Sequence, residues 1–198
     1  MTKKILIATQ NKGKQKEMLA LLEESRFTVL TPQDIGLSLH IKETGASYAE
    51  NARLKAQAFF EVCQIPTLAD DSGLEVEALG GAPGLFSARF SPLPNATDAD
   101  RRELLLKKLS DFAEPWKARF VCSMALAMPE NRFDFSVGSC SGTIIAEERG
   151  ASGFGFDPIF LCNGFQKTMA ELNMEEKNTI SHRANAMRGM MPHLERLW

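Results

Sequence analysis

Two adjacent aspartates, Asp70 and Asp71, follow an apolar segment and precede Ser72-Gly73 and a second run of alternating apolar residues. This order predicts a strand that ends in a polar turn before the next strand begins. Two neighbouring carboxylates repel each other when both are ionised, so chains that keep such a pair commonly use one for a cation or for proton transfer. A solvated turn without chemistry remains the alternative for this run alone, because short motifs recur by chance.

The composition is that of an ordinary soluble globular protein. The chain has 198 residues, of which 44% are hydrophobic and 24% are charged, and this length suffices for one domain with a substantial core. We therefore expect a single domain over residues 1–198. The formal net charge of −2 argues against a general nucleic-acid-binding protein, which normally carries a basic excess. An anionic small molecule can still be attracted by a few lysines.

The spacing of the cysteines and the length of the apolar runs indicate where in the cell the protein is located. No Cys-x-x-Cys pair occurs, so buried thiols are favoured over disulfides or zinc ligands at Cys63, Cys122, Cys140 and Cys162. The first apolar run ends at Ala8 and no later run is longer, so we expect neither a signal peptide nor a membrane span. The prediction is a cytoplasmic protein that does not bind membranes.

Apolar periodicity predicts an alternation of strands and helices. The early strand-helix-strand order followed by a hairpin favours an α/β fold around a mixed sheet. A serine with a glutamate three residues later, Ser47 and Glu50, has the spacing of a helix-capping box. The expected strands are 5–8, 27–30, 74–78, 118–128 and 132–146, and the expected helices are 14–22, 47–62, one starting at 97 and one starting at Ser181.

The turn Thr9-Gln10-Asn11-Lys12-Gly13-Lys14 lies between the first strand and the first helix. Backbone N–H groups at such a position can face a phosphate. The spacing is not that of a Walker A loop, and a polar turn with solvated lysines is an equally good interpretation of this segment alone.

A single carboxylate, Glu43, precedes Gly45 upstream of the second expected helix. Most such glutamates lie on the surface without a special role. If Glu43 converges on Asp70 or Asp71, the cluster would suit Mg²⁺, which proteins hold with a few carboxylates and substrate phosphates.

The segment Ser152-Gly153-Phe154-Gly155-Phe156-Asp157-Pro158 combines loop glycines with two aromatic residues. Such aromatics usually anchor a loop into the core. A platform on which a nucleobase stacks is the alternative.

Donor side chains gather at Lys177, His182 and Arg183, around the predicted start of the last helix. Cations are unfavourable at a helix N-terminus. The cluster therefore suggests a ligand that brings negative charge or hydrogen-bond acceptors, although a solvated basic stretch remains possible.

Together these segments resemble the inosine triphosphate pyrophosphatase family, the Ham1-type enzymes that act on non-canonical purine nucleoside triphosphates. The similarity covers nearly the whole chain, and its parts occur in the expected order. Phe156 stands where the family often has tyrosine. The matching segments are residues 9–14, Glu43-Thr44-Gly45, Glu50-Asn51-Ala52, Leu54-Lys55-Ala56, residues 69–74, residues 80–84, Ser87-Ala88-Arg89, the loop around Phe154 and Ser181-His182-Arg183.

The resemblance implies a fold, a reaction and an assembly. The fold would be an elongated, mixed β-sheet flanked by helices, with an active-site cleft between two lobes. The reaction would be hydrolysis of ITP, dITP and XTP between the α and β phosphates, which removes deaminated purine nucleotides from the pool. The enzyme would use Mg²⁺ and form a homodimer.

The resemblance also assigns roles to residues. Asp71 would be the catalytic base, and Glu43 and Asp71 would hold Mg²⁺. Asp70 could supply a second carboxylate, so the sequence does not divide these roles between the two aspartates. Lys14, Lys55 and Lys177 would neutralise the triphosphate. The full substrate-binding set would be Thr9, Gln10, Asn11, Lys12, Gly13, Lys14, Lys55, Ser72, Phe154, Gly155, Phe156, Asp157, Lys177, His182 and Arg183.

Base selection would follow from donors at the purine 6-position. Phe154 would stack on the base, while His182 and Arg183 would approach its 6-oxo group. Arginine can only donate hydrogen bonds, so it would bind the 6-oxo group of a purine and disfavour the 6-amino group of adenine. Guanine also has a 6-oxo group, and no residue in the sequence identifies what would exclude GTP.

Two alternatives define what a test must separate. A Maf-type nucleotide pyrophosphatase would carry a Ser-x-Ser-Pro-Arg-Arg loop near its N-terminus, which this sequence lacks. A non-catalytic nucleotide-binding protein on the same scaffold would not need Glu43, Asp71 and Lys14 together.

Overall fold

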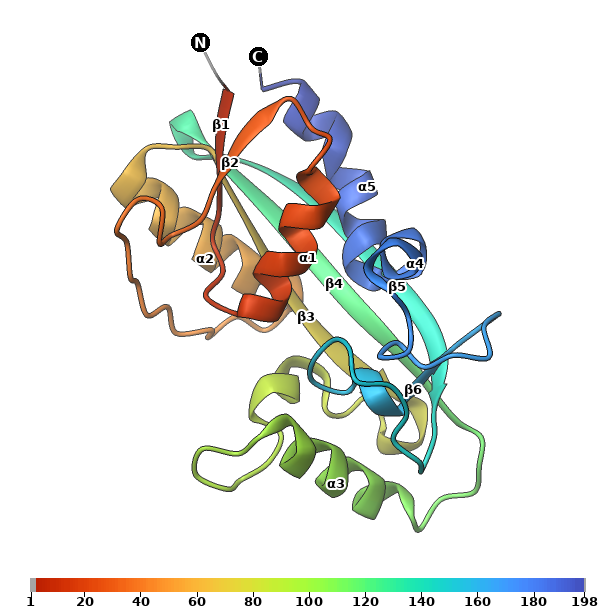
Figure 1. Cartoon of the computed structure of the whole chain (residues 1–198). Coiled ribbons are helices and arrows are strands. Elements are labelled where there is room, and N and C mark those ends of the chain that lie inside the picture. Colours follow the sequence, from red (N-terminus) through yellow and green to blue (C-terminus); the bar gives the residue numbers. More distant parts are fainter. Residues whose placement is uncertain (1–2, 198) are drawn as a thin grey trace. The chain divides into compact units, whose positions relative to one another are not determined.

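A computed structural model of the protein describes residues 3–197, and its strands form one mixed sheet. The strands are β1 (Lys3–Ile7), β2 (Phe27–Leu30), β3 (Thr67–Val76), β4 (Trp116–Met128), β5 (Arg132–Ile144) and β6 (Phe160–Cys162). They are ordered β2-β1-β3-β4-β5-β6 (Figure 1). β1 pairs in parallel with β2 and β3, whereas β5 and β6 are antiparallel. The predicted mixed α/β fold is confirmed.

A side chain caps the N-terminus of each of the first four helices. The helices are α1 (Lys12–Leu22), α2 (Tyr48–Cys63), α3 (Asp98–Leu109), α4 (Met174–Ile180) and α5 (His182–Glu195). Ser47 accepts a hydrogen bond from the Glu50 N–H at the start of α2, as predicted. Thr97 and Asp100 form a complete capping box on α3. These caps are local features, so the sequence predicts where α2 and α3 start.

The described chain divides into two compact units. Unit 1 holds residues 3–71, 122–138 and 183–197, and unit 2 holds residues 72–121 and 139–182. β3, β4 and β5 each run from one unit into the other. The two units are therefore built on shared strands, and each has its own core.

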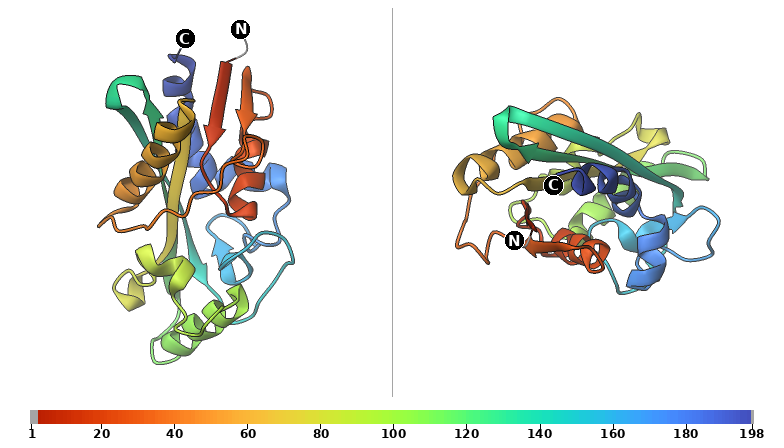
Figure 2. Two further views of the ribbon diagram at one scale, coloured as in Figure 1. Left: turned by 90° about the vertical axis from the view of Figure 1, so that its left-hand side faces the viewer. Right: turned by 90° about the horizontal axis from the view of Figure 1, so that it is seen from above.

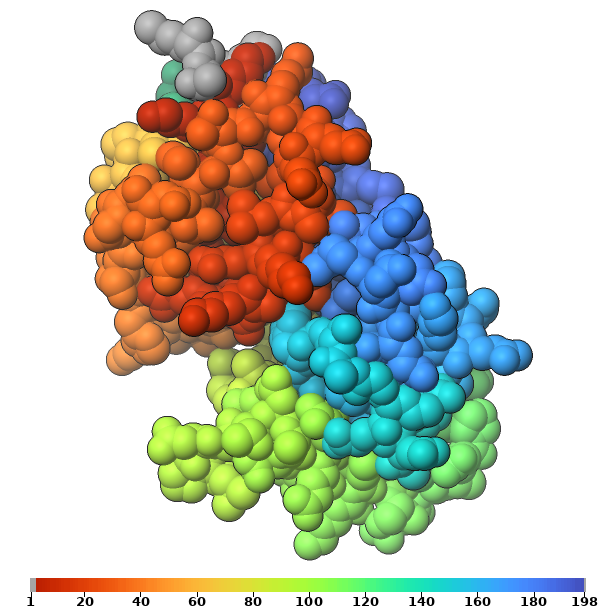
Figure 3. All heavy atoms as spheres, in the orientation of Figure 1, coloured from red at the N-terminus to blue at the C-terminus, as the bar shows by residue number. Residues whose placement is uncertain are grey.

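Unit 1 buries both faces of β1. Successive residues of β1 point to opposite faces, so Ile5 and Ile7 join one cluster and Leu6 joins the other. The first cluster includes residues of α1 and α5, and the second includes residues of α2, so helices cover both faces (Figures 1 and 2). The segment 31–47, which has no helix or strand, lies on the surface of this unit (Figure 3, orange).

Unit 2 has a core rich in aromatic residues. Leu105 and Leu109 of α3 pack in one cluster with Trp116, Phe120 and Phe160. Phe120 and Phe160 contact each other with ring centroids 4.5 Å apart. Burial of these large side chains stabilises this unit through the hydrophobic effect.

One sequence expectation about this fold is wrong. The predicted polar turn at Asp70-Asp71-Ser72-Gly73 does not exist, because β3 continues without a break from Thr67 to Val76. Both aspartates are nearly inaccessible, with 1% and 6% of their surface exposed. Carboxylates remain in a buried strand only where cations and hydrogen-bond donors meet them. The sequence analysis also missed β6 and α4.

Two smaller expectations can be compared directly with the structure. All four cysteines are free thiols, and Cys122, Cys140 and Cys162 are buried as predicted, whereas Cys63 is only partly buried. Among residues 3–197, no helix is both long and apolar enough to cross a membrane.

Candidate active site

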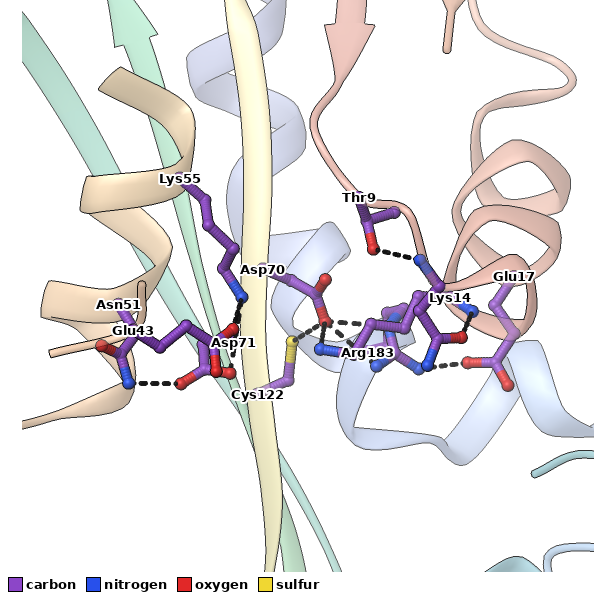
Figure 4. Close-up of polar contacts among 11 residues, drawn as sticks. Thr9, Lys14, Glu17, Glu43, Asn51, Lys55, Asp70, Asp71, Cys122 and Arg183 are labelled. Atoms are coloured by element: carbon purple, nitrogen blue, oxygen red, sulfur yellow. Dashed lines mark hydrogen bonds and ion pairs between the residues drawn. The ribbon is translucent and has the colours of Figure 1, made fainter. Parts of the chain in front are cut away.

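Asp70 and Asp71 point to opposite faces of β3, as adjacent residues of a strand must. Figure 4 shows Asp70 on the side of α1 and α5 and Asp71 on the side of α2. The two carboxylates therefore meet separate sets of partners, all of which belong to unit 1. This separation allows two neighbouring acids to have different electrostatic properties.

Asp70 lies in a dense group of donors. Its Oδ2 accepts hydrogen bonds from Arg183 Nε at 3.2 Å and Nη2 at 3.0 Å. Lys14 Nζ lies 3.2 Å from the same oxygen, and the Cys122 thiol donates to it at 3.8 Å. Burial alone would raise the pKa of Asp70, but the charges of Lys14 and Arg183 outweigh it and hold this pKa far below its usual range. Asp70 is therefore a permanent anion.

Arg183 is fully buried, with 0% of its surface exposed. Its Nη1 donates to Glu17 of α1, while Nε and Nη2 donate to Asp70. Burial opposes the charge, but Asp70 and Glu17 outweigh that effect and raise the pKa of Arg183. The guanidinium thus joins the first helix, the central strand and the last helix of unit 1.

Asp71 is held by two residues of α2 (Figure 4). Asn51 Nδ2 donates to Asp71 Oδ2 at 3.0 Å, and Lys55 Nζ lies 3.5 Å from Asp71 Oδ1. Burial raises the pKa of Asp71, and the nearby Lys55 and Lys14 offset that effect only in part. Asp71 is therefore the better proton acceptor of the pair, because its pKa is raised whereas that of Asp70 is lowered.

Glu43 and Asp71 converge on one cation. Lys55 Nζ lies 2.8 Å from Glu43 Oε1 as well as 3.5 Å from Asp71 Oδ1. Burial would lower the pKa of Lys55, but Asp71, Asp70 and Glu43 together raise it. The segment 31–47 thus delivers Glu43 to the Asp71 side of β3, as the sequence analysis required for a metal site.

The donor set fits a magnesium ion that completes its coordination with substrate. Glu43 and Asp71 supply hard carboxylate oxygens, and Mg²⁺ is typically held by one or two carboxylates plus phosphates and water. Within residues 3–197, no group of three or more His, Cys, Asp or Glu side chains forms a metal cage by itself. The remaining ligands would therefore have to come from substrate and solvent.

Hydrogen bonds within the turn between β1 and α1 hold it in a fixed shape. The Asn11 N–H donates to Thr9 Oγ1, and the Asn11 side chain accepts from the Lys14 N–H at the start of α1. Gln15 Nε2 donates to the Thr9 carbonyl at 2.8 Å. Gln10 and Lys12 are exposed. A turn of fixed shape with exposed polar groups before a helix can bind an anion through its backbone N–H groups.

Unit 2 contains a second buried ion pair. Lys177 Nζ lies 2.6 Å from Asp157 Oδ2, and both side chains are 5% exposed. The same carboxylate oxygen accepts from the Phe154 N–H at 3.0 Å, and Lys177 Nζ lies 5.6 Å from the centre of the Phe154 ring. Gly153 has a φ of +78°, and a Cβ there would lie 2.1 Å from Asp157 Oδ2. Only glycine fits at this position, so the backbone that presents Phe154 is fixed.

The other predicted base-binding residues of unit 2 have different surroundings. Gly155 is anchored to α3, since its N–H donates to Asp98 Oδ2 at 2.7 Å. Phe156 packs in the core with 4% of its surface exposed, which is the anchoring role weighed for aromatics in this loop. The His182 ring is 5% exposed and stacks on Phe120 with a centroid distance of 4.8 Å.

The structure groups the predicted residues into two sets. In unit 1, Glu43, Lys55 and Asp71 come together on one face of β3, and Lys14 pairs with Asp70 on its other face. In unit 2, Phe154, Asp157 and Lys177 come together. Ser72 is half-buried and follows Asp71 in β3. The sequence analysis expects Arg183 at the purine edge, whereas its guanidinium lies against Asp70 and Glu17.

Three residues of these networks were missed. Glu17 contacts Arg183 and Cys122 contacts Asp70. No local sequence pattern distinguishes either position. Asn51 had a usable signal, because it lies four residues before Lys55 and therefore on the same side of α2.

Comparison with known proteins gives consistent matches over nearly the whole chain. A sequence model of the Ham1 family matches residues 5–193. A protein of Halalkalibacterium halodurans named dITP/XTP pyrophosphatase is 46% identical over 189 residues, covering 94% of this chain and 96% of that protein. A Listeria monocytogenes protein of the same name is 46% identical over 187 residues, covering 93% of this chain and 91% of its own length.

Solved structures agree with these matches. The Ham1 protein of Coxiella burnetii superposes with a TM-score of 0.87 at 39% identity, covering 98% of this chain and 99% of its own. The Staphylococcus aureus Ham1 protein gives a TM-score of 0.84 at 37% identity, with 98% of both chains covered.

The different surroundings of the two aspartates predict different effects on stability. Asp70→Asn leaves the buried Arg183 without its charged partner on β3, and loss of one partner of a buried ion pair typically costs about 3–5 kcal/mol. Asp71→Asn removes a carboxylate whose burial is only partly offset, so we expect a change of at most about 1 kcal/mol. Urea unfolding at pH 7, followed by circular dichroism, measures both. Equal losses for the two variants would contradict this electrostatic difference.

Proposed function

The chain belongs to the Ham1 family, and we propose on this premise that it hydrolyses the non-canonical purine nucleoside triphosphates ITP, dITP and XTP. The bond broken is the α–β phosphoanhydride, and the products are a nucleoside monophosphate and pyrophosphate. The observation that carries the proposal is the convergence of Glu43 and Asp71 on Lys55, beside the Lys14 turn in unit 1. Such an activity would remove deaminated purines from the nucleotide pool of the cytoplasm.

In this proposal the triphosphate binds to residues of unit 1. Phosphoryl chemistry depends mostly on positioning and on stabilisation of charge. Lys14 and Lys55 supply positive charge, and the backbone N–H groups of the Thr9–Gly13 turn supply further donors. Asp70 keeps Lys14 in place through the 3.2 Å ion pair, so the lysine is ordered before substrate arrives.

Glu43 and Asp71 would hold Mg²⁺ together with the phosphates. When bound, the ion would polarise the phosphate oxygens and lower the pKa of a coordinated water. Asp71 accepts the proton of the attacking water, a role that its raised pKa supports. Lys55 balances the charge of both carboxylates.

The purine is assigned to residues of unit 2. The Phe154 ring offers a stacking surface whose backbone is fixed by Asp157, and Lys177 lies beside the ring. His182 and Arg183 are the proposed donors to the 6-oxo group. Arg183 is paired with Asp70 and Glu17, so any contact with a base would have to be compatible with that network.

Product analysis tests the reaction directly. With Mg²⁺, the wild-type protein should convert ITP to IMP and pyrophosphate, and ATP, GTP and pyrimidine nucleotides serve as comparison substrates. Asp71→Asn should lower turnover by about 10²–10⁴-fold, the usual contribution of a general base. Chromatography of the nucleotides with a pyrophosphate assay gives both results. Formation of IDP and orthophosphate, or near-normal turnover by Asp71→Asn, would overturn the assignment.

Base selection gives a second test. A site built to hydrogen-bond a substrate group can reject an analogue that lacks it by about 10⁴-fold, so ITP and XTP should be preferred over ATP. Arg183→Ala should reduce kcat/KM for ITP far more than for ATP. Cys122→Ala, which also disturbs the surroundings of Asp70 but removes no charge, is the matched control and should affect both nucleotides equally. Equal losses in Arg183→Ala would assign that residue to the anchoring of Asp70 alone.

We further propose that the enzyme is a homodimer, as the family resemblance implies. Multi-angle light scattering at micromolar concentration should then give twice the single-chain mass of 21.9 kDa. A measured mass of one chain would disprove the dimer and leave the catalytic proposal intact.

A further inference from the structure

Asn51 forms a bridge between two parts of the candidate site. Its side chain is buried at 1% exposure. The Gly45 N–H donates to Asn51 Oδ1 at 2.8 Å, and Asn51 Nδ2 donates to Asp71 Oδ2 at 3.0 Å. Because a backbone N–H can only donate, the oxygen of the amide must face Gly45 and its nitrogen must face Asp71. The orientation of the amide is therefore fixed by its partners.

Asn51 and Lys55 lie one turn apart on α2 and divide the two oxygens of Asp71 between them (Figure 4). Lys55 meets Oδ1 at 3.5 Å and Asn51 meets Oδ2 at 3.0 Å. A carboxylate held at both oxygens by one rigid helix has a defined plane. Lys55 is a long and flexible cation, whereas Asn51 has a short side chain with both ends bonded, so Asn51 sets this plane more tightly.

The other end of the bridge holds the segment that carries Glu43. A Cβ on Gly45 would lie 2.8 Å from Asn51 Oδ1 and 2.7 Å from Glu50 Cβ, so the backbone packs directly against α2. The next N–H, of Ala46, donates to Glu50 Oε2 at 2.6 Å. Glu43 is two residues from Gly45, in a segment without helix or strand. Its position therefore depends on these contacts with the start of α2.

We propose that Asn51 is a positioning residue for the reaction: its amide couples the backbone at Gly45 to the Asp71 carboxylate and so sets the relative placement of Glu43 and Asp71. This inference rests on the proposed function, in which those two carboxylates hold the metal ion. Partners of metal ligands typically contribute about 10–100-fold to metal affinity or activity. Asn51 does not itself contact the phosphates or the metal ion in this scheme.

The test compares Asn51→Leu, which keeps the approximate volume but removes both hydrogen bonds, with two further variants. Gly45→Ala forces a Cβ against the Asn51 amide and disturbs the bridge from its other end. Ser47→Ala removes the cap of the same helix without touching Gly45 or Asp71, so it is the control for destabilisation of α2. Each protein is measured for Mn²⁺ affinity without nucleotide, by electron paramagnetic resonance, and for kcat and KM with ITP and Mg²⁺.

Asn51→Leu and Gly45→Ala should each weaken Mn²⁺ binding and lower kcat by about 10–100-fold, with a smaller change in KM, since the lysines and the Thr9–Gly13 turn are unaltered. Ser47→Ala should lower the melting temperature and leave both quantities near wild type. If Asn51→Leu and Gly45→Ala have Mn²⁺ affinities and kcat values within twofold of those of Ser47→Ala, the proposal is overturned. The absence of Mn²⁺ binding by the wild-type protein would overturn it as well. If Asn51→Leu does not fold, Gly45→Ala decides. If wild type binds Mn²⁺ but releases no pyrophosphate from ITP, the proposed function fails while the Mn²⁺ comparison still tests Asn51.

Discussion

The buried ion pair between Arg183 and Asp70 is the interaction on which unit 1 depends. Removing either charge from water is costly, and the attraction repays that cost only when the remaining donors and acceptors are also met. Here Lys14 adds a second cation at Asp70 Oδ2 and Glu17 accepts from Arg183, so two cations and two anions balance, while Asp70 Oδ1 is buried without a hydrogen-bond partner among residues 3–197. The partners are 113 and 166 residues apart in the sequence. The pair is therefore satisfied only when α1, β3 and α5 have all reached their native positions.

This network explains how two adjacent aspartates acquire different chemistry. The alternation of β3 sends Asp70 toward two cations and Asp71 toward α2, where burial is only partly offset. The first carboxylate stays ionised and fixes Lys14, while the second retains the ability to take up a proton. The two adjacent negative charges therefore do not prevent the strand from forming, because cations meet each carboxylate on its own face of β3.

Features set by neighbouring residues could be predicted from the sequence, and features set by distant ones could not. Ser47 caps α2 as predicted because its partner, Glu50, is three residues away. The sequence predicts that the strand ends at Asp70, because the cations that stabilise this buried carboxylate come from α1 and α5. β6 is only three residues long and is defined by its pairing with β5. The capping box of Asn173 and Glu176 at α4 was available in the sequence and was overlooked.

The same locality argument applies to the candidate site. Glu43, Lys55 and Asp71 stand out as charged residues in recognisable motifs, whereas Asn51 and Glu17 act through side chains that contact those motifs only after folding. The aromatic residues of one loop also differ, since Phe154 is half-buried beside Lys177 and Phe156 is part of the core. Residue type and spacing did not distinguish them, because that difference depends on which ring the backbone turns inward.

The energy of the Arg183 network limits how this residue can take part in base selection. A hydrogen bond from a charged donor is worth about 1.5–3 kcal/mol, whereas separating one partner from a buried ion pair costs about 3–5 kcal/mol. Exchanging Asp70 for a purine oxygen would therefore be unfavourable unless another cation replaced Arg183 at the aspartate. The same cost applies to the buried Glu17 pair, so any contact of Arg183 with a 6-oxo group would have to be made while both carboxylate pairs are retained. Discrimination between a 6-oxo and a 6-amino purine by Arg183 thus depends on Asp70 holding the guanidinium in place, which connects the stability of unit 1 to its specificity.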